Sequence, residues 1–397
     1  MKSRGHGVYS SPFAVCAAIF AILLLADIQL VRGYVSDSLS LCVRAVIPSL
    51  FPFAVMTELI FFDGRGIVFP RFFRRAVREI FGVAENLSSA FVTGMITGFP
   101  MGAAAISRVY ESGGCTKSEA EYAAAISGMP SPAFILGTVG ASVFSSLHAG
   151  LFLMFIQFLS VIPVSILMRL TVAKRTSSEE VTVEKRQAPP FSLSVISRGI
   201  KNAGLNLLTV CSCVVFFTAV SGYIMNKVGI ASDGNGVISA LLSGTFELTA
   251  GVSRLGGTHI LRALPCAAAL IGFGGLSVLC QISSVCEKSG ISVIPFLISR
   301  VYFAFFNFIF TLAVEYLLPF AVPTFGHGFI EAITPRYESG DAVPYFGYAF
   351  IFALTVLLVK FIPAAFFSVI HLISWIRAKK VPHGMAAADD NGVKRDR

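Results

Sequence analysis

Long apolar stretches constrain the fold of this chain more than any other feature. Several run for about 20 residues with one ionisable group or none; residues 149–170, for instance, contain only Arg169. As a helix, such a stretch is long enough to cross about 30 Å of hydrocarbon. A backbone in lipid must also satisfy its own hydrogen bonds, which a helix does. The pattern therefore predicts an all-α polytopic membrane protein.

The composition agrees with a membrane location and argues against nucleic-acid binding. Of the 397 residues, 55% are apolar and 13% are charged, and the mean hydropathy is +0.77. Soluble domains carry about 25% charged residues. The net charge is +9, but Lys and Arg lie mainly in short segments between apolar stretches, where they set membrane topology. We therefore expect the lipid bilayer as a partner and no nucleic acid.

The sequence carries no recognisable motif for metal binding or catalysis. The eight cysteines and six histidines are scattered, without a CxxC pair. Cysteine in apolar stretches behaves as a small hydrophobe, so neither a metal site nor a disulfide framework is predicted. No P-loop, nucleophile elbow or HExxH motif occurs. We expect no enzymatic activity, no cofactor and no ATP hydrolysis.

Eight segments are predicted to cross the membrane. They are residues 12–31, 45–62, 122–144, 149–170, 205–228, 261–285, 301–320 and 345–376. Two further apolar segments, residues 86–110 and 237–255, contain interruptions. Basic clusters lie near both termini, at residues 65–78 and at residues 174–201. All four clusters can face the cytoplasm only if the two interrupted segments are re-entrant hairpins that do not cross.

This topology places both termini in the cytoplasm and makes the two halves inverted repeats, as alternating access commonly uses. The alternative, that either interrupted segment is a full span, stays open. The chain divides into N-terminal spans (residues 1–62), a first repeat (63–172), a cytoplasmic linker (173–203), a second repeat (204–322), a polar loop with a C-terminal span (323–380) and a tail (381–397).

Two kinds of interruption occur at matching places in the halves. The motif GFPMG at residues 98–102 follows SAFVTG, and FELTAG at residues 246–251 follows the similar hexamer SALLSG. Further along, AAAISG precedes MPSP at residues 129–132, and AAALIG precedes FGG at residues 273–275. Paired Gly- and Pro-interrupted apolar segments are typical of repeat-built transporters, whose substrate binds at the broken helices.

The interruptions supply the candidate substrate-binding residues. Freed carbonyls bind cations and the N-termini of half-helices bind anions, whereas the alternative is a mere kink or a tight helix contact. The candidates are Gly98, Phe99, Pro100, Gly102, Ser127, Gly128, Pro130, Ser131, Thr245, Glu247, Thr249, Gly272, Gly274 and Gly275.

Glu247 is the most informative of these candidates. A carboxylate at bilayer depth is costly unless it is solvated or paired. We therefore interpret Glu247 as a ligand for substrate, proton or cation, and as the proton- or cation-coupling residue. The alternative is a carboxylate at a hairpin tip in ordinary interfacial water. The hydroxyls of Ser243, Thr245 and Thr249 are expected either to bind substrate or to satisfy freed backbone groups.

Other polar residues in apolar stretches are expected to be structural. Glu315 and Lys360 are candidates for an ion pair, and Glu58 lies in the second predicted span. Gln157, Gln281 and Asn307 are expected to form hydrogen bonds between helices.

Five blocks resemble the nucleoside-recognition, or Gate, domain proteins. They are TGFPMG at residues 97–102, YESGG at 110–114, SEAE at 118–121, PAFILGTVG at 132–140 and GTFELTAG at 244–251. The resemblance covers roughly residues 40–380. It implies a fold similar to that of the concentrative nucleoside transporters, with paired hairpins and broken helices.

Within that family, the resemblance is closest to the membrane proteins that act in spore formation. It implies transport of a small organic anion, dipicolinic acid, from the mother cell towards the forespore across the outer forespore membrane. Two alternatives are a cation-coupled nucleoside transporter, with Glu247 binding sugar hydroxyls or the cation, and a non-transporting scaffold that assembles with other spore membrane proteins. Homo-oligomerisation stays open.

Overall fold

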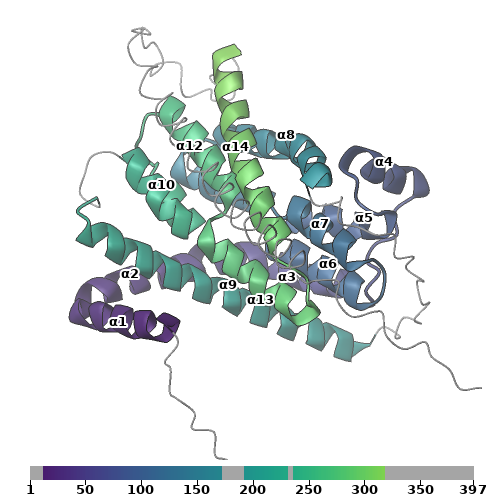
Figure 1. The fold of residues 1–397 in the computed structure, drawn as a ribbon, viewed down its shortest axis with the longest axis horizontal. Helices are drawn as coiled ribbons and strands as arrows, with labels where there is room; N and C mark the ends of the chain where they lie inside the picture. Colours follow the sequence, from purple (N-terminus) through teal and green to yellow (C-terminus); the bar gives the residue numbers. More distant parts are fainter. Residues whose placement is uncertain (1–11, 172–191, 231–235, 318–397) are drawn as a thin grey trace, which may run out of the picture. The chain divides into compact units, whose positions relative to one another are not determined.

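The computed structural model describes residues 12–171, 192–230 and 236–317, and every regular element among them is a helix (Figure 1). Most of the predicted linker, the polar loop, the last predicted span with Lys360, and the tail lie outside the described residues. In chain order the helices are α1 (Pro12–Ala26), α2 (Ile28–Leu41), the π-helix η1 (Cys42–Val46), α3 (Ile47–Ile60), α4 (Arg71–Phe81), the 3-10 helix η2 (Glu85–Leu87), α5 (Ser88–Thr97), α6 (Met101–Glu111), α7 (Lys117–Ser127), the π-helix η3 (Phe134–Val143), α8 (Leu147–Thr171), α9 (Leu193–Lys227), α10 (Gly236–Phe246), α11 (Leu248–Ser253), α12 (Ile260–Phe273), α13 (Gly275–Ser289) and α14 (Ile294–Leu317).

Four helical segments of the described part are long and apolar enough to cross a membrane. They are α8, α9, the run from α12 through α13, and α14. These segments overlap the spans predicted at residues 149–170, 205–228, 261–285 and, as far as it is described, 301–320. The span predicted at residues 122–144 is instead divided into α7 and η3. The structure thus fits a polytopic, all-helical membrane protein.

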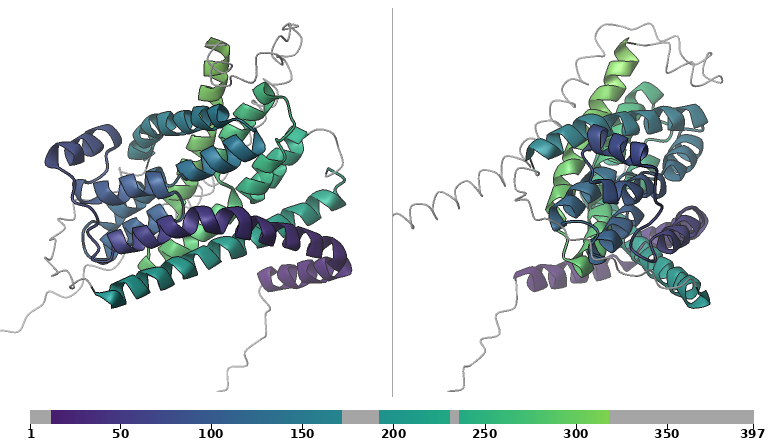
Figure 2. Two further views of the ribbon diagram at one scale, coloured as in Figure 1. Left: turned by 180° about the vertical axis from the view of Figure 1, so that it is seen from behind. Right: turned by 90° about the vertical axis from the view of Figure 1, so that its right-hand side faces the viewer.

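The N-terminal helices differ from the prediction. The span predicted over residues 12–31 is not one straight helix, because α1 ends at Ala26 and the chain bends by 97° before α2. Ala17–Ala26 and Ile28–Arg44 are together long and apolar enough for a fifth span, as either a broken span or a re-entrant loop. Asp27 occupies the bend and binds the Lys227 Nζ at 2.8 Å and the Tyr223 hydroxyl at 3.1 Å, both on α9. From Ile28 to Ile60, α2, η1 and α3 follow one another without a gap alongside α9 (Figure 2). The predicted second span is therefore the later part of a longer helix.

The two interrupted segments form helical hairpins. The first hairpin consists of α5 and α6, and the second of α10 and α11. In the first, a Cβ on Gly102 would lie 2.7 Å from the Gly94 Cα. In the second, a Cβ on Gly251 would lie 2.2 Å from the Gly244 Cα. In both hairpins, a pair of glycines therefore lets the two backbones touch.

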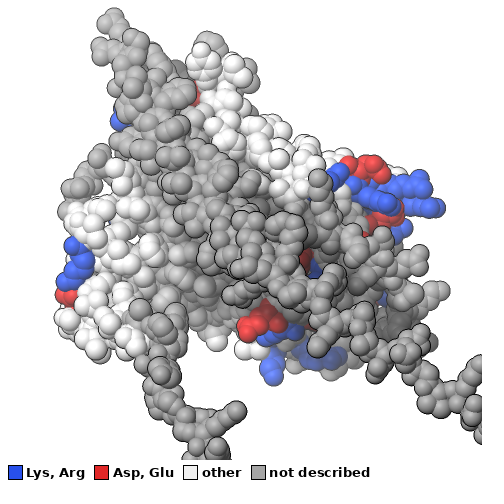
Figure 3. All heavy atoms as spheres, viewed as in Figure 1, with Lys and Arg blue, Asp and Glu red and all other residues white. Residues whose placement is uncertain are grey.

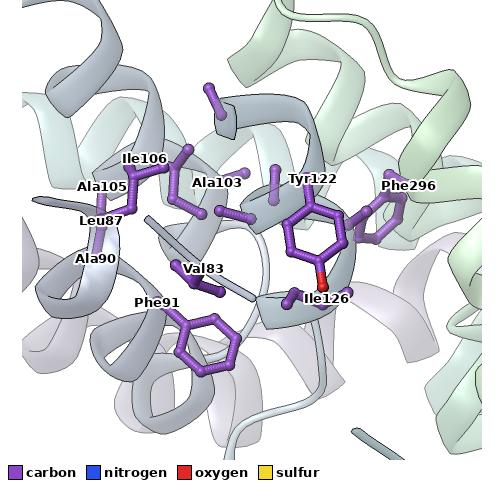
Figure 4. Packing of buried hydrophobic residues seen from close by; sticks show 14 of the residues in the cluster. Val83, Leu87, Ala90, Phe91, Ala103, Ala105, Ile106, Tyr122, Ile126 and Phe296 are labelled. Carbon is purple, nitrogen blue, oxygen red and sulfur yellow. The ribbon is translucent and has the colours of Figure 1, made fainter. Parts of the chain in front are cut away.

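Two large hydrophobic clusters surround the hairpins. The first packs α5 and α6 against α7, α8, α13 and α14, and Figure 4 shows part of it, including Phe91, Ile106, Tyr122, Ile126 and Phe296. The second packs η3 and α8 against the second hairpin and α12. Phe99, at the tip of the first hairpin, packs against both clusters. This tip therefore lies where the two cores meet.

Candidate functional site

The tip of the first hairpin docks on the break that follows α7. The Phe99 N–H donates to the Met129 carbonyl at 3.0 Å. Gly98 has φ +76°, and a Cβ there would lie 2.5 Å from the Ser131 N. Glycine is therefore required at position 98 both by the backbone conformation and by this close approach.

The tip of the second hairpin docks in a similar way on the break between α12 and α13. Gly274 and Gly275 have φ +82° and +85°. A Cβ on Gly275 would lie 2.9 Å from the Gly244 carbonyl oxygen and 3.3 Å from the Leu248 N. Each hairpin tip thus packs on a glycine-containing break in the helix pair that follows it.

One pocket brings together the two tips, the first break and helix α13, which follows the second break. About 60 Å³ of the pocket admits the centres of water-sized molecules, and the wider space between its walls, about 610 Å³, includes open solvent. The first half contributes Phe99, Pro130, Ser131, Phe134 and Thr138. The second half contributes Glu247, Leu248, Thr249, Val278 and Gln281. Helices α2, η1, α3 and α9 form an apolar wall with Leu41, Val46, Leu50, Val210 and Val214.

Five of the predicted site residues line this pocket: Phe99, Pro130, Ser131, Glu247 and Thr249. They come from three segments, the first tip, the first break and the second tip, which the sequence places up to 150 residues apart. Residues from the paired interruptions therefore line one pocket.

The other predicted residues shape the backbone around the pocket and do not line it. Gly98, Pro100 and Gly102 form the first hairpin, and Gly274 and Gly275 form the second break. Gly128 lies against the Phe296 ring, which a Cβ would approach to 2.3 Å, and Gly272 lies against the backbone of Phe303 and Ala304.

Ser127 and Thr245 point elsewhere. The Ser127 Oγ is buried beside Gly94 and has no hydrogen-bond partner. Thr245 is exposed, and its hydroxyl donates to the Leu241 carbonyl of its own helix at 2.9 Å. The Leu241 carbonyl lies inside α10 and is not freed by the break, so this bond is not the backbone role expected for Thr245.

Glu247 is held at the start of α11. Its side chain is buried and accepts the Ala250 N–H at 2.6 Å, so it caps this short helix. The N–H and hydroxyl of Thr249 also interact with the carboxylate. With 3% of its surface exposed, Glu247 does not sit in ordinary interfacial water. It is a fixed carboxylate in the pocket wall.

The remaining polar groups of the pocket are mainly neutral donors. The Ser131 Oγ accepts the Phe134 N–H at 3.2 Å, which leaves its own O–H to donate. Gln281 donates to the Ser277 Oγ of its own helix at 3.1 Å, so the helix–helix bond predicted for Gln281 is not formed there. The spacing of Gln281 from Gly274, two helical turns, was the available signal that it shares the face of the break. No Lys or Arg is among the residues that line the pocket.

Arg300 is a buried residue that sequence reasoning missed. It is fully buried on α14, and its guanidinium lies between the rings of Phe296 and Phe303, 4.5 and 4.4 Å from their centroids. Its Nη2 donates to the Ala125 carbonyl at 3.0 Å. Since α7 ends two residues later, this carbonyl lacks the helical donor that a continuous helix would give it. The predicted span began at residue 301, which left Arg300 outside it.

Two further polar clusters join helices away from the pocket. The Glu58 carboxylate pairs with Arg108 of α6 and accepts from Asn202 and Asn206 of α9 at 3.2 and 3.4 Å. Asn307 donates to Gln157 at 2.6 Å, which confirms the bond between helices predicted for these two residues.

In the part of the chain that the structure describes, no three His, Cys, Asp or Glu side chains gather where they could hold a metal ion.

Comparison with known proteins gives one informative similarity. Over 301 residues the chain is 27% identical to the sporulation integral membrane protein YlbJ of Bacillus subtilis (strain 168), a match that covers 66% of this chain and 72% of that protein. No family model matches the chain, and no solved structure matches it. The similarity and the apolar helices together support a sporulation-associated integral membrane protein related to YlbJ.

Proposed function

We propose that this protein is a transporter whose substrate binds in the pocket between the two hairpin tips. One observation carries the proposal: the walls of a single pocket are built from the interrupted helices of both halves. Secondary transporters commonly bind substrate between repeats, at discontinuous helices. The substrate we propose is a small organic anion, dipicolinic acid, moved during sporulation from the mother cell towards the forespore across the outer forespore membrane.

We also infer that the halves are inverted repeats with re-entrant hairpins, in a Gate-type fold similar to that of concentrative nucleoside transporters, with both termini cytoplasmic. The matched glycine pairs support this inference, since Gly94 meets Gly102 and Gly244 meets Gly251. The docking of each tip on the next break supports it as well.

The chemistry of the walls suggests how a planar dianion would bind. Apolar side chains such as Phe99 and Phe134 offer surfaces for an aromatic ring, and the hydroxyl of Ser131 and the amide of Gln281 offer donors to carboxylates. Glu247 would repel a dianion unless it carried a proton or bound a cation. We therefore assign Glu247 the role of coupling substrate movement to a proton or cation.

A nucleoside is the second candidate substrate. The pocket has a carboxylate and no Lys or Arg in its walls, which suits a neutral ligand with hydroxyl groups. In that case Glu247 would accept hydrogen bonds from the sugar.

Uptake into proteoliposomes that carry the full-length protein tests these proposals. Labelled dipicolinate and labelled uridine are compared in wild type, in Glu247→Gln and in Glu287→Gln, a matched control at an exposed acid of α13. Saturable dipicolinate uptake that is lost only in Glu247→Gln is expected. Uptake of uridine alone would replace the anion with a nucleoside. No flux of either from folded protein would contradict transport and favour a scaffold that assembles with other spore membrane proteins.

A further inference from the structure

Helix α4 presents three distinct faces. Phe73, Val77 and Phe81 recur every four residues, and this face packs against the first hydrophobic cluster. The end of the helix is fixed to the bundle, because the Arg169 Nη2 donates to the Ile80 carbonyl at 2.9 Å and the Tyr122 hydroxyl donates to the Phe81 carbonyl. The orientation of α4 on the bundle is therefore well defined.

A second face of α4 is basic. Arg71, Arg74, Arg75 and Arg78 follow the spacing of one helical face, and Glu79 is the acid within the helix. Arg78 makes an ion pair with Glu85 at 3.7 Å but keeps 64% of its side chain exposed. Figure 3 shows Lys and Arg side chains gathered at this helix, with acidic side chains beside them. This face is a dense positive patch on an exposed helix.

The third face of α4 is apolar and exposed. Phe72 is 74% exposed and Ile80 is 50% exposed, and Val68, just before the helix, is 80% exposed. Large apolar side chains beside arginines are typical of helices that lie in the membrane interface, with the apolar face among acyl chains and the basic face at the headgroups.

We propose that α4, together with Val68, lies in the membrane interface and binds the headgroups of anionic phospholipids. The arginines supply the charge complementarity, and each basic residue near an anionic surface is worth about fivefold in affinity. The exposed Phe72, Ile80 and Val68 favour a lipid over a free phosphate, since only a lipid offers acyl chains that cover them.

Lipid binding by the full-length protein in a neutral detergent tests this inference. Native mass spectrometry measures the affinity for phosphatidylglycerol and for phosphatidylcholine. The variant is Arg71→Gln/Arg75→Gln/Arg78→Gln, and the matched control removes three exposed basic residues elsewhere, Arg198→Gln/Lys201→Gln/Lys288→Gln. If the triple variant does not fold, Arg75→Gln alone takes its place.

Wild type is expected to prefer phosphatidylglycerol. The α4 variant should lose about 100-fold of that affinity, or about fivefold for Arg75→Gln, while the control keeps it. Equal affinity for the two lipids, or an equal loss in the control, would overturn the inference. Displacement of phosphatidylglycerol by millimolar inorganic phosphate would overturn it too, because the site would then bind a phosphate and not a lipid.

Discussion

The two hairpins share a glycine-paired construction but differ in how they are fastened. The first is tied to its surroundings by the Glu58–Arg108 ion pair and by a Ser289–Ser107 hydrogen bond of 3.2 Å. Among the described residues, the side chains of the second hairpin make hydrogen bonds only within the hairpin itself. Each has one buried carboxylate associated with it, yet Glu58 anchors a helix from outside whereas Glu247 faces the pocket. Glu58 and Glu247 are both buried, so their partners, and not their burial, distinguish the anchor from the pocket residue.

The largest effect is expected from removing the anchor of the first hairpin. Glu58→Ala leaves the partly exposed Arg108 without its partner and should lower the free energy of unfolding by about 3 kcal/mol. Unfolding of purified protein in detergent measures this loss. The double variant Glu58→Ala/Arg108→Met should recover part of it. Equal stability of Glu58→Ala and wild type would show that the ion pair does not fasten the hairpin.

The glycine pairs should tolerate no side chain. Gly251→Ala should destabilise by about 1–3 kcal/mol, and more than Gly102→Ala, because its Cβ would come within 2.2 Å of a backbone atom instead of 2.7 Å. Gly204→Ala on α9 is the control, since nothing lies within 4 Å of its Cβ. That control should be neutral or stabilising. A stable Gly251→Ala protein would refute the close contact in the second hairpin.

Removing the Arg300 guanidinium should speed hydrogen exchange at the first hairpin tip and leave it unchanged at the second. Without this guanidinium the Ala125 carbonyl loses a donor, so the break that accepts the Phe99 N–H should open more often. Hydrogen exchange in Arg300→Met should be about tenfold faster for the peptide around Phe99 and unchanged around Glu247. Arg169→Met, which removes a guanidinium bound to the end of α4, is the control. Equal acceleration at both tips would indicate global loosening.

The smallest effect is expected at Thr245. Its exposed hydroxyl bonds its own helix, so Thr245→Ala should change the free energy of unfolding by no more than about 0.5 kcal/mol and leave ligand affinity unchanged. A large loss of ligand affinity in Thr245→Ala would show that Thr245 contributes to ligand binding.

The features of the fold that the sequence predicts are those that depend on residues close together in the chain. Apolar length identified α8, α9 and α14, and the Gly and Pro interruptions located both hairpin tips. What the sequence did not reveal depended on distant partners. Asp27, at the bend between α1 and α2, makes an ion pair with Lys227, which lies 200 residues later in the sequence. Arg300 donates to a carbonyl of α7. Gln281 lines the pocket beside residues of the second tip, which the sequence places more than 30 residues earlier.

Ligand binding to variants of both tips tests most directly whether one site spans the two hairpins. Affinity for dipicolinate and for uridine is measured at equilibrium with wild type, Phe99→Ala, Thr249→Ala, the double variant and Thr245→Ala. Each tip substitution should weaken binding of the same ligand about tenfold, with a non-additive effect in the double variant and none in Thr245→Ala. A ligand that binds with unchanged affinity when either tip is altered would contradict a shared site.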